Sequence, residues 1–379
     1  MMKNLSLYVH IPFCEKKCAY CDFLSFQADE TLQRTYLLAV IKEMKLYLPY
    51  VKDYEIQTIF FGGGTPSILQ EGEISFLMEN IQKNFNLSPH CETSIEINPG
   101  TFSLNKSKEY RKANINRLSF GLQSTKENEL ITLGRIHQYK DFLYSYDWAR
   151  EEDFCNINVD LIYGIPEQNF KSFQETLNQI FNLKPAPEHL SIYHLILEED
   201  TPFYQLYKSN QYPLPDEKEE EKIEKWMKNR LKEGGYLRYE ISNYAKKEYE
   251  CYHNLVYWNL DEYIGIGLGA ASYFKGRRYH NTKKLKEYLA LNTIAWCKAQ
   301  DLSQKEEIEE FIFLGLRKIE GISAQKFFQK FAFPIEDLYA DLLEKLKKQG
   351  LLKQIKERIF LSEKGLDLSN YVMSQFLLD

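Results

Sequence analysis

Three cysteines near the N-terminus have the residue type and the spacing to hold a metal cluster. Cys14, Cys18 and Cys21 form a C-x3-C-x2-C pattern, and the aromatic residue Tyr20 comes directly before the third sulfur. Thiolates are the usual protein ligands of iron–sulfur clusters, and a cluster of four irons ordinarily takes four of them. Three cysteines would therefore leave one iron without a protein ligand. We expect the chemistry of this chain to start at that open iron.

Zinc is the main alternative metal for clustered thiolates. Structural zinc sites usually take four protein ligands, which often come from paired C-x2-C motifs. The chain has no second C-x2-C pair near the triplet. The pattern therefore favours an iron–sulfur cluster over zinc or free thiols.

The elements that must position these cysteines are predicted by six apolar runs rich in Val, Ile, Phe and Tyr. The first five are each followed by a stretch of helix-forming composition, and the sixth by an irregular segment and then a helix. Such alternation predicts an α/β fold with parallel strands and crossover helices, and six units suit a partial (β/α)6 barrel of the TIM type as well as a doubly wound sheet. The runs lie near residues 5–11, 56–61, 93–97, 117–122, 156–163 and 189–195.

Motifs that could bind a ligand come at the predicted ends of five of these strands. In a barrel of parallel strands the active groups lie at the C-terminal ends, so these motifs should meet at one mouth. After the first strand come the cysteines; the next four strands end at GGGTP (62–66), EINPG (96–100), GLQS (121–124) and DLIYGIP (160–166).

The residue composition of the chain changes after residue 200, where a loop with prolines leads into a charged helix. We expect a barrel over 1–200, a connecting region over 201–300 that completes its core, and a smaller, mostly helical, winged-helix-like domain over 301–379. The connecting region has a stretch rich in tyrosine, residues 235–258, that could form strands or a hairpin.

Composition excludes several classes of protein. The chain has 379 residues, 44% of them hydrophobic, which is enough for a large core, and its net charge of -6 gives no basic footprint for nucleic acid. The N-terminus reads as a strand, and no apolar run is long enough to span a membrane. We expect a cytoplasmic protein that contacts membranes only through partners.

The cysteine pattern after a first strand resembles the motif of the radical S-adenosylmethionine (SAM) superfamily. The resemblance implies a [4Fe-4S] cluster whose open iron is chelated by the amine and carboxylate of SAM, and reductive cleavage of SAM. It also implies that the glycine-rich turn after the second strand brings backbone carbonyls to the SAM amino group. That role falls to Gly63 and Gly64, with Thr65 beside them.

The remaining groups of SAM need further partners. Arg135, in LGRIH, can form a bidentate pair with the carboxylate. Three residues at strand ends can take hydroxyl or amino groups, and two tyrosines offer aromatic faces near the cluster. These residues are Glu96, Gln123 and Asp160, and Tyr8 and Tyr20. Each of them could instead be a structural cap or a surface group.

A closer resemblance runs over nearly the whole chain, through LYVHIPFCEKKCAYCDF, FFGGGTPS, IEINPG, RLSFGLQS, LGRIH, NVDLIYGIPEQ, YEISNYA and HNLVYW. These motifs resemble the group that contains the oxygen-independent coproporphyrinogen III dehydrogenases and the HemW haem chaperones. Three features favour the chaperones: the short lead before Cys14, Phe23 at the position of a further cysteine, and the pattern H-N-x-x-Y-W. The last is present as His253, Asn254, Tyr257 and Trp258.

Haem binding by the H-N-x-x-Y-W motif has a physical basis. A neutral imidazole is a good axial ligand for haem iron, and Tyr257 and Trp258 supply flat apolar faces for a porphyrin. His253 could equally be a packed, hydrogen-bonded core residue. Cys251 is an alternative ligand, and His280 and His10 are weaker candidates, since His10 can brace the cysteine loop.

The resemblance implies a haem chaperone that binds haem, passes it to acceptor proteins such as respiratory enzymes, and carries a SAM-coordinated [4Fe-4S] cluster. That cluster could support a homodimer or transfer rather than turnover. Two enzymes are the rivals: a coproporphyrinogen III dehydrogenase, and a radical SAM enzyme that modifies tRNA. The acidic balance of the chain argues against the second.

Overall fold

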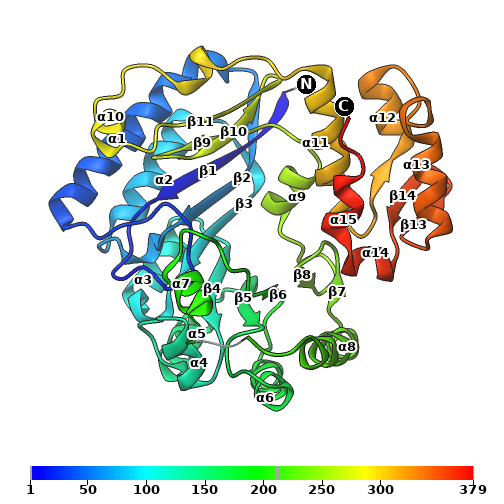
Figure 1. The fold of residues 1–379 in the computed structure, drawn as a ribbon. Helices are drawn as coiled ribbons and strands as arrows, with labels where there is room; N and C mark the ends of the chain where they lie inside the picture. Colours follow the sequence, from blue (N-terminus) through cyan, green and yellow to red (C-terminus); the bar gives the residue numbers. More distant parts are fainter. Residues whose placement is uncertain (1, 210, 212–213, 379) are drawn as a thin grey trace.

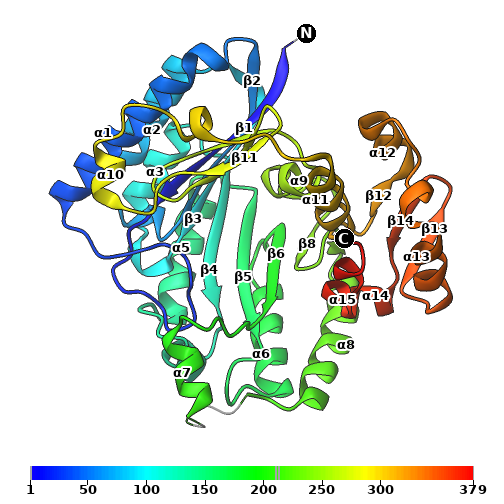
Figure 2. The ribbon, with the colours of Figure 1, turned by 45° about the horizontal axis from the view of Figure 1, so that its top comes forward.

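A computed structural model describes residues 2–209, 211 and 214–378 of the chain. Six parallel strands, neighbours in chain order, form the centre of one curved eleven-stranded sheet (Figures 1 and 2). The predicted partial barrel of six strands is therefore confirmed. Its strands are β1 (Lys3–Ile11), β2 (Tyr54–Gly63), β3 (Leu87–Ile97), β4 (Arg117–Gln123), β5 (Ile157–Tyr163) and β6 (His189–His194).

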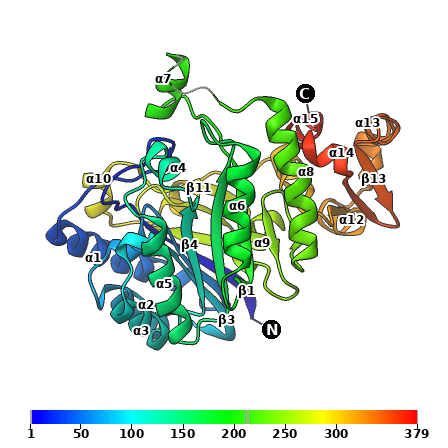
Figure 3. The same ribbon diagram turned by 90° about the horizontal axis from the view of Figure 1, so that it is seen from below.

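Alternation along the strands separates a helix-covered face from the barrel interior. On β4, Leu118 and Phe120 join the large apolar core, whereas Ser119 and Gly121 line a cavity inside the barrel. Helices cover the apolar face (Figure 3). They are α1 (Glu30–Tyr47), α2 (Glu73–Asn84), α3 (Leu104–Lys112), α4 (Glu127–Thr132), α5 (Tyr139–Glu151) and α6 (Phe170–Phe181), with 3-10 turns η1 (Leu48–Tyr50), η2 (Pro66–Ile68) and η3 (Pro99–Thr101).

Residues 214–300 extend the sheet at both edges. Two short strands, β7 (Leu237–Arg238) and β8 (Asn243–Ala245), pair with each other and add to β6, so part of the tyrosine-rich stretch forms the expected hairpin. At the other edge, β9 (Tyr263–Ile266) runs parallel to β1, and β10 (Ala271–Phe274) and β11 (Arg277–His280) follow antiparallel. The described helices between residues 202 and 300 are α7 (Pro202–Lys208), α8 (Glu217–Glu233), α9 (Tyr252–Trp258), α10 (Leu285–Leu289) and the 3-10 turn η4 (Ala295–Lys298).

The C-terminal part has an apolar core of its own, from Ile308 to Phe376, beside the barrel core, which extends from Leu5 to Ala299. A hairpin of β13 and β14, as a winged-helix-like domain requires, is present, and two short helices follow it. Where the domains divide remains a prediction. The elements are α11 (Gln304–Leu316), β12 (Ile322–Ser323), α12 (Ala324–Phe331), α13 (Glu336–Lys348), β13 (Leu352–Ile355), β14 (Arg358–Leu361), α14 (Glu363–Asp367) and α15 (Ser369–Ser374).

None of the helices within residues 2–209, 211 and 214–378 combines the length and the apolar character that a membrane span requires.

Candidate functional site

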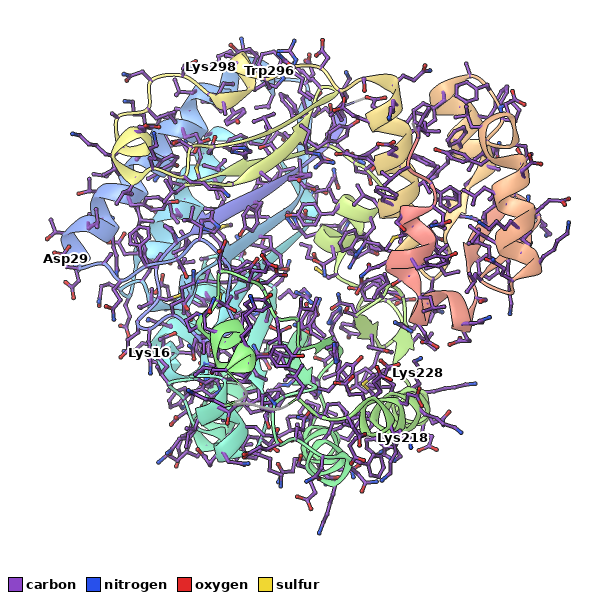
Figure 4. All side chains as sticks on the ribbon, in the orientation of Figure 1. Lys16, Asp29, Lys218, Lys228, Trp296 and Lys298 are labelled. Atoms are coloured by element: carbon purple, nitrogen blue, oxygen red, sulfur yellow. The ribbon has the colours of Figure 1, made fainter. Side chains whose placement is uncertain are left out.

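The loop that carries the three cysteines is held at the C-terminal ends of the first two strands. The backbone N–H of Thr65 donates to the carbonyl of Phe13 at 2.8 Å, and that of Cys14 donates to the carbonyl of Phe26 at 3.1 Å. Lys16, labelled in Figure 4, lies on this loop. These bonds attach the loop to the mouth of the barrel, where the strand motifs were expected to meet.

The side chain of His10, on β1, supports the same loop through a hydrogen bond. Its Nε2 lies 3.0 Å from the carbonyl oxygen of Leu24, and its Nδ1 lies 3.0 Å from the hydroxyl of Tyr8. Because a carbonyl only accepts, Nε2 carries the proton and Nδ1 accepts from Tyr8. Burial lowers the pKa of His10, which keeps the ring neutral in this role.

Gly63 and Gly64 are required by the close approach of β2 to this loop. Gly63 has φ +116, and a Cβ there would lie 2.5 Å from the His10 ring. A Cβ on Gly64 would lie 2.7 Å from the carbonyl oxygen of Phe13 and 3.0 Å from the sulfur of Cys14. The glycine-rich turn therefore has a packing function, in addition to the SAM contact that the resemblance implies.

The structure brings all three cysteines to one cavity at the mouth of the barrel. All three are free thiols, and burial raises the pKa of Cys21 to about 11. Eight of the nine predicted SAM contacts line the same cavity: Tyr20, Gly63, Gly64, Thr65, Glu96, Gln123, Arg135 and Asp160.

Two buried polar atoms in this cavity have no hydrogen-bond partner among the described residues. Gln123 has φ +74 beside an irregularity in the pairing of β4 with β5, and its Oε1 has no hydrogen bond among the described residues. The Nε of Arg135 is likewise buried and without a partner there, although Nη1 lies 3.5 Å from the Cys18 sulfur and Nη2 donates to the carbonyl of Gly121 at 2.6 Å. Groups buried in this way are rare in proteins, and a ligand would satisfy them.

Two carboxyl groups, those of Glu96 and Asp160, line the cavity. Glu96 accepts from the backbone N–H of Gly63 at 3.0 Å, and burial together with the nearby Asp160 raises its pKa to about 8. Burial also raises the pKa of Asp160, which accepts from the amide of Asn158 at 2.8 Å. These carboxyls can accept from hydroxyl or amino groups of a bound molecule.

Several residues that line this cavity were not predicted from the sequence, among them Asn98 and Ser119. Asn98 belongs to EINPG, and Ser119 lies two positions before Gly121 on β4, so strand alternation could have identified both. Lys16, Lys17 and Phe23 also line it, but nothing in the sequence indicated which side chains of the cysteine loop point inward.

The H-N-x-x-Y-W motif lies at a different place, on helix α9 near the opposite end of the barrel interior. The His253 side chain is buried, with 1% of its surface exposed, and both ring nitrogens are engaged. Nδ1 lies 2.7 Å from the hydroxyl of Thr58, and Nε2 lies 2.8 Å from the hydroxyl of Tyr257. Because Thr58 donates its own proton to Ser6, Nδ1–H donates to Thr58 and Nε2 accepts from Tyr257.

Charge and burial hold His253 neutral. Burial, with the positive charge of the buried Arg117, lowers the pKa of His253 to about 3. Cys251 is also buried, its sulfur lies 3.6 Å from an oxygen of Glu92, and burial raises the pKa of its thiol to about 12. In this conformation neither candidate ligand is open to an iron atom.

The other members of the motif differ from His253. Tyr257 and Trp258 line a second cavity of about 400 Å³, together with Tyr8, which lies outside the cavity of the cysteines. Asn254 is half-buried on α9 and lines neither of these two cavities. Among the weaker candidates, His280 is exposed on β11 and its Nδ1 lies 3.0 Å from the carbonyl oxygen of Asn281.

Models of two known protein families match the barrel part and the C-terminal part of the chain. Residues 8–180 match the Radical SAM superfamily, and residues 302–368 match the HemN C-terminal domain. The first match covers the cysteine loop and the five strand ends, and the second covers most of the C-terminal core.

Relatives match the chain over nearly its full length. The protein named heme chaperone HemW of Bacillus subtilis (strain 168) is 36% identical over 98% of this chain and 99% of the relative. The chain belongs to the HemW family. Within this family, proteins of the same name from Lactococcus lactis subsp. lactis (34% identical, 100% of this chain and 99% of the relative) and Escherichia coli K12 (32%, 99% and 98%) are also similar.

A solved structure shows the fold of this HemW-family chain in a relative. The coproporphyrinogen III oxidase HemN from Escherichia coli, described as a radical SAM enzyme, matches with a TM-score of 0.84. The two are 24% identical, and the match covers 99% of this chain and 90% of that one. At this identity the likeness concerns the fold alone.

Radical SAM domains such as the one in this HemW-family chain imply a [4Fe-4S] cluster and SAM, and the cavity of the cysteines fits both. Among the described residues, no three His, Cys, Asp or Glu side chains are grouped closely enough to hold a single metal ion. A cluster of four irons differs, because each thiolate binds a separate iron. The buried atoms of Gln123 and Arg135 that lack partners are available to polar groups of a bound molecule such as SAM.

Proposed function

We propose that this chain is a haem chaperone, which binds haem and delivers it to haem-requiring acceptor proteins such as respiratory enzymes. One observation carries this proposal: three proteins named heme chaperones match at least 98% of the chain at 32 to 36% identity. The matches include the cysteine loop, helix α9 and the C-terminal part, so they concern the whole protein and not the barrel alone.

The cavity at the mouth of the barrel would hold the cluster and SAM. In this proposal the sulfurs of Cys14, Cys18 and Cys21 are the ligands, and the eight lining residues described above position SAM. The cluster, when bound, supplies an electron for reductive cleavage of SAM. The protein contributes the thiolates, which must lose their protons on binding, and a loop fixed by backbone hydrogen bonds. A homodimer is a further prediction for this state.

Haem would lie against Tyr257 and Trp258 in the second cavity. The volume of this cavity, about 400 Å³, falls in the range of small-molecule sites, and its lining is rich in aromatic side chains. If His253 is the axial ligand, Nε2 must first release the hydroxyl of Tyr257, because that hydrogen bond occupies its lone pair. Tyr257 would then control access of the iron to His253.

A haem titration of the anaerobically reconstituted protein tests the proposal, followed by the Soret band. We expect saturable binding that is weakened in Trp258→Ala, and a Soret position that changes in His253→Ala. Tyr257→Phe frees Nε2 and should strengthen ligation by His253. His90→Ala, which changes an exposed histidine that is no candidate ligand, is the matched control. An unchanged affinity and spectrum in His253→Ala would remove His253 as the ligand.

Delivery needs a separate measurement. The haem-loaded chain is mixed with the haem-free form of a b-type respiratory cytochrome, and with apomyoglobin as a general haem acceptor. We expect haem to pass to the cytochrome faster than it is released spontaneously to apomyoglobin. Equal rates would contradict a delivery function. Formation of protoporphyrinogen IX from coproporphyrinogen III, with SAM and a reductant, would instead assign the chain to the dehydrogenases.

A further inference from the structure

Arg317, at the C-terminal end of α11, carries a charge that no acidic side chain among the described residues neutralises. Its guanidinium lies over the ring of Trp258, with 4.5 Å between Cζ and the ring centroid. Within the part of the chain that the structure describes, no acidic side chain forms an ion pair with it, and its Nε is buried without a hydrogen-bond partner. The indole N–H of Trp258 is also buried without a partner there. Two donors thus lie together without an acceptor.

These two residues adjoin the second cavity. Trp258 lines it from α9, and Phe313 and Leu314 line it from α11, one turn before Arg317. Figures 1 and 2 both show α9 and α11 side by side, between the barrel and the C-terminal part. Most of the side chains that line the cavity are therefore aromatic or aliphatic, and the Arg317 cation lies over Trp258 beside it.

Arg278, which lines the cavity, differs from Arg317. The guanidinium of Arg278 donates to both oxygens of Glu310, at 3.0 and 2.6 Å, and to the hydroxyl of Tyr263 at 2.9 Å. Its charge and its donors are satisfied inside the protein, so it offers little to a ligand. Of these two arginines, Arg317 is the one without an ion pair among the described residues.

We propose that Arg317 binds a propionate carboxylate of haem while the porphyrin face lies against Trp258 between α9 and α11. This inference rests on the proposed haem-carrying function. Haem joins a large apolar plate to two carboxylates, which matches an aromatic cavity with an unpaired guanidinium beside it. A planar guanidinium pairs with a carboxylate through two parallel hydrogen bonds, and the indole N–H of Trp258 is a further donor nearby.

The alternative is that Arg317 only stacks on Trp258. Arg34 provides the comparison within the same chain, because its guanidinium lies 4.0 Å from the ring centroid of Phe76 and also pairs with Glu73 at 2.6 Å. Arg34 therefore has the same stacking with its charge already neutralised. A variant at this position measures the effect of losing a stacked arginine alone.

The test titrates the full-length chain with haem and with haem dimethyl ester, whose propionates are masked. We expect Arg317→Met to weaken haem binding by about tenfold or more, Arg317→Lys to weaken it less, and Arg34→Met to leave it unchanged. The dimethyl ester should bind wild type and Arg317→Met with the same, weaker affinity.

Two results would overturn the inference while leaving the proposed function in place. One is haem binding to Arg317→Met as tight as to wild type. The other is wild-type affinity for the dimethyl ester equal to that for haem, a result that does not depend on whether any variant folds. If wild type binds neither ligand, the proposed function itself fails.

Discussion

The polar groups of Gln123 and Arg135 in the cysteine cavity and those of His253 and Glu92 near α9 differ in how fully they are satisfied. At the cysteine end, Oε1 of Gln123 and Nε of Arg135 are buried without partners among the described residues. At the α9 end, His253 uses both ring nitrogens, and Glu92 accepts from the backbone N–H groups of Tyr252 and His253 at 3.1 and 3.0 Å. Unpaired buried groups indicate a place for a ligand, whereas saturated groups indicate a structural role.

The largest expected effect is at the cysteine end. Replacing Cys14, Cys18 or Cys21 by Ser should abolish cluster assembly, because a cluster that starts with three protein ligands cannot spare one. Iron and sulfide content after anaerobic reconstitution measures this. Cys155→Ser, which changes an exposed cysteine, should retain the full content. Normal iron and sulfide in any of the three variants would contradict the ligand assignment.

At the α9 end the expected effect is on stability. Glu92→Ala removes the acceptor for two backbone N–H groups of α9 and a negative charge near the buried Arg117. We expect the free energy of unfolding to fall by about 3 kcal/mol, measured by urea denaturation.

Glu248→Ala is the control for this change. Glu248 is exposed and pairs with the equally exposed Lys247, so its loss should matter little. If Glu92→Ala and Glu248→Ala unfold at the same urea concentration, the saturated network at α9 does not stabilise the fold.

Gly64→Ala should perturb the cysteine loop without removing a ligand. The new Cβ meets the carbonyl of Phe13 at 2.7 Å, so the loop must shift, and we expect a loss of about 2 kcal/mol in stability with weaker SAM binding. Gly100→Ala is the matched control, because its Cβ would have ordinary contacts beginning at 3.5 Å. SAM affinity by calorimetry, together with urea denaturation, distinguishes the two. Unchanged SAM affinity in Gly64→Ala would argue that the close packing of Gly64 against the cysteine loop does not matter for SAM binding.

The effect that is smallest near neutral pH, and grows only in acid, concerns the protonation of His253. Burial keeps the folded-state pKa of His253 near 3, below its unfolded value of about 6.5, so the unfolded chain binds the extra proton between these values. This contribution to stability is complete above pH 6.5 and decreases as the pH falls, by about 1.4 kcal/mol per pH unit. His253→Ala should show a correspondingly shallower loss of stability between pH 6 and 4. Identical slopes would show that His253 is not held neutral.

Much of this protein was predictable because its chemistry is local in sequence. The cysteine spacing, the six apolar runs and the motifs at strand ends predicted the barrel and the group of residues at its mouth, since parallel strands bring their C-terminal ends together. The helix at HNLVYW was missed, because its tyrosine-rich surroundings favour strands.

What only the tertiary structure decided are the partners of individual side chains. The sequence does not reveal that Thr58 and Tyr257 occupy both nitrogens of His253, or that Tyr8 faces the second cavity. It does not place Arg317 on Trp258 either, because 58 residues separate them. The type and spacing of residues determine what a chain can bind. Whether a buried group is free to bind depends on contacts between distant segments, which exist only after folding.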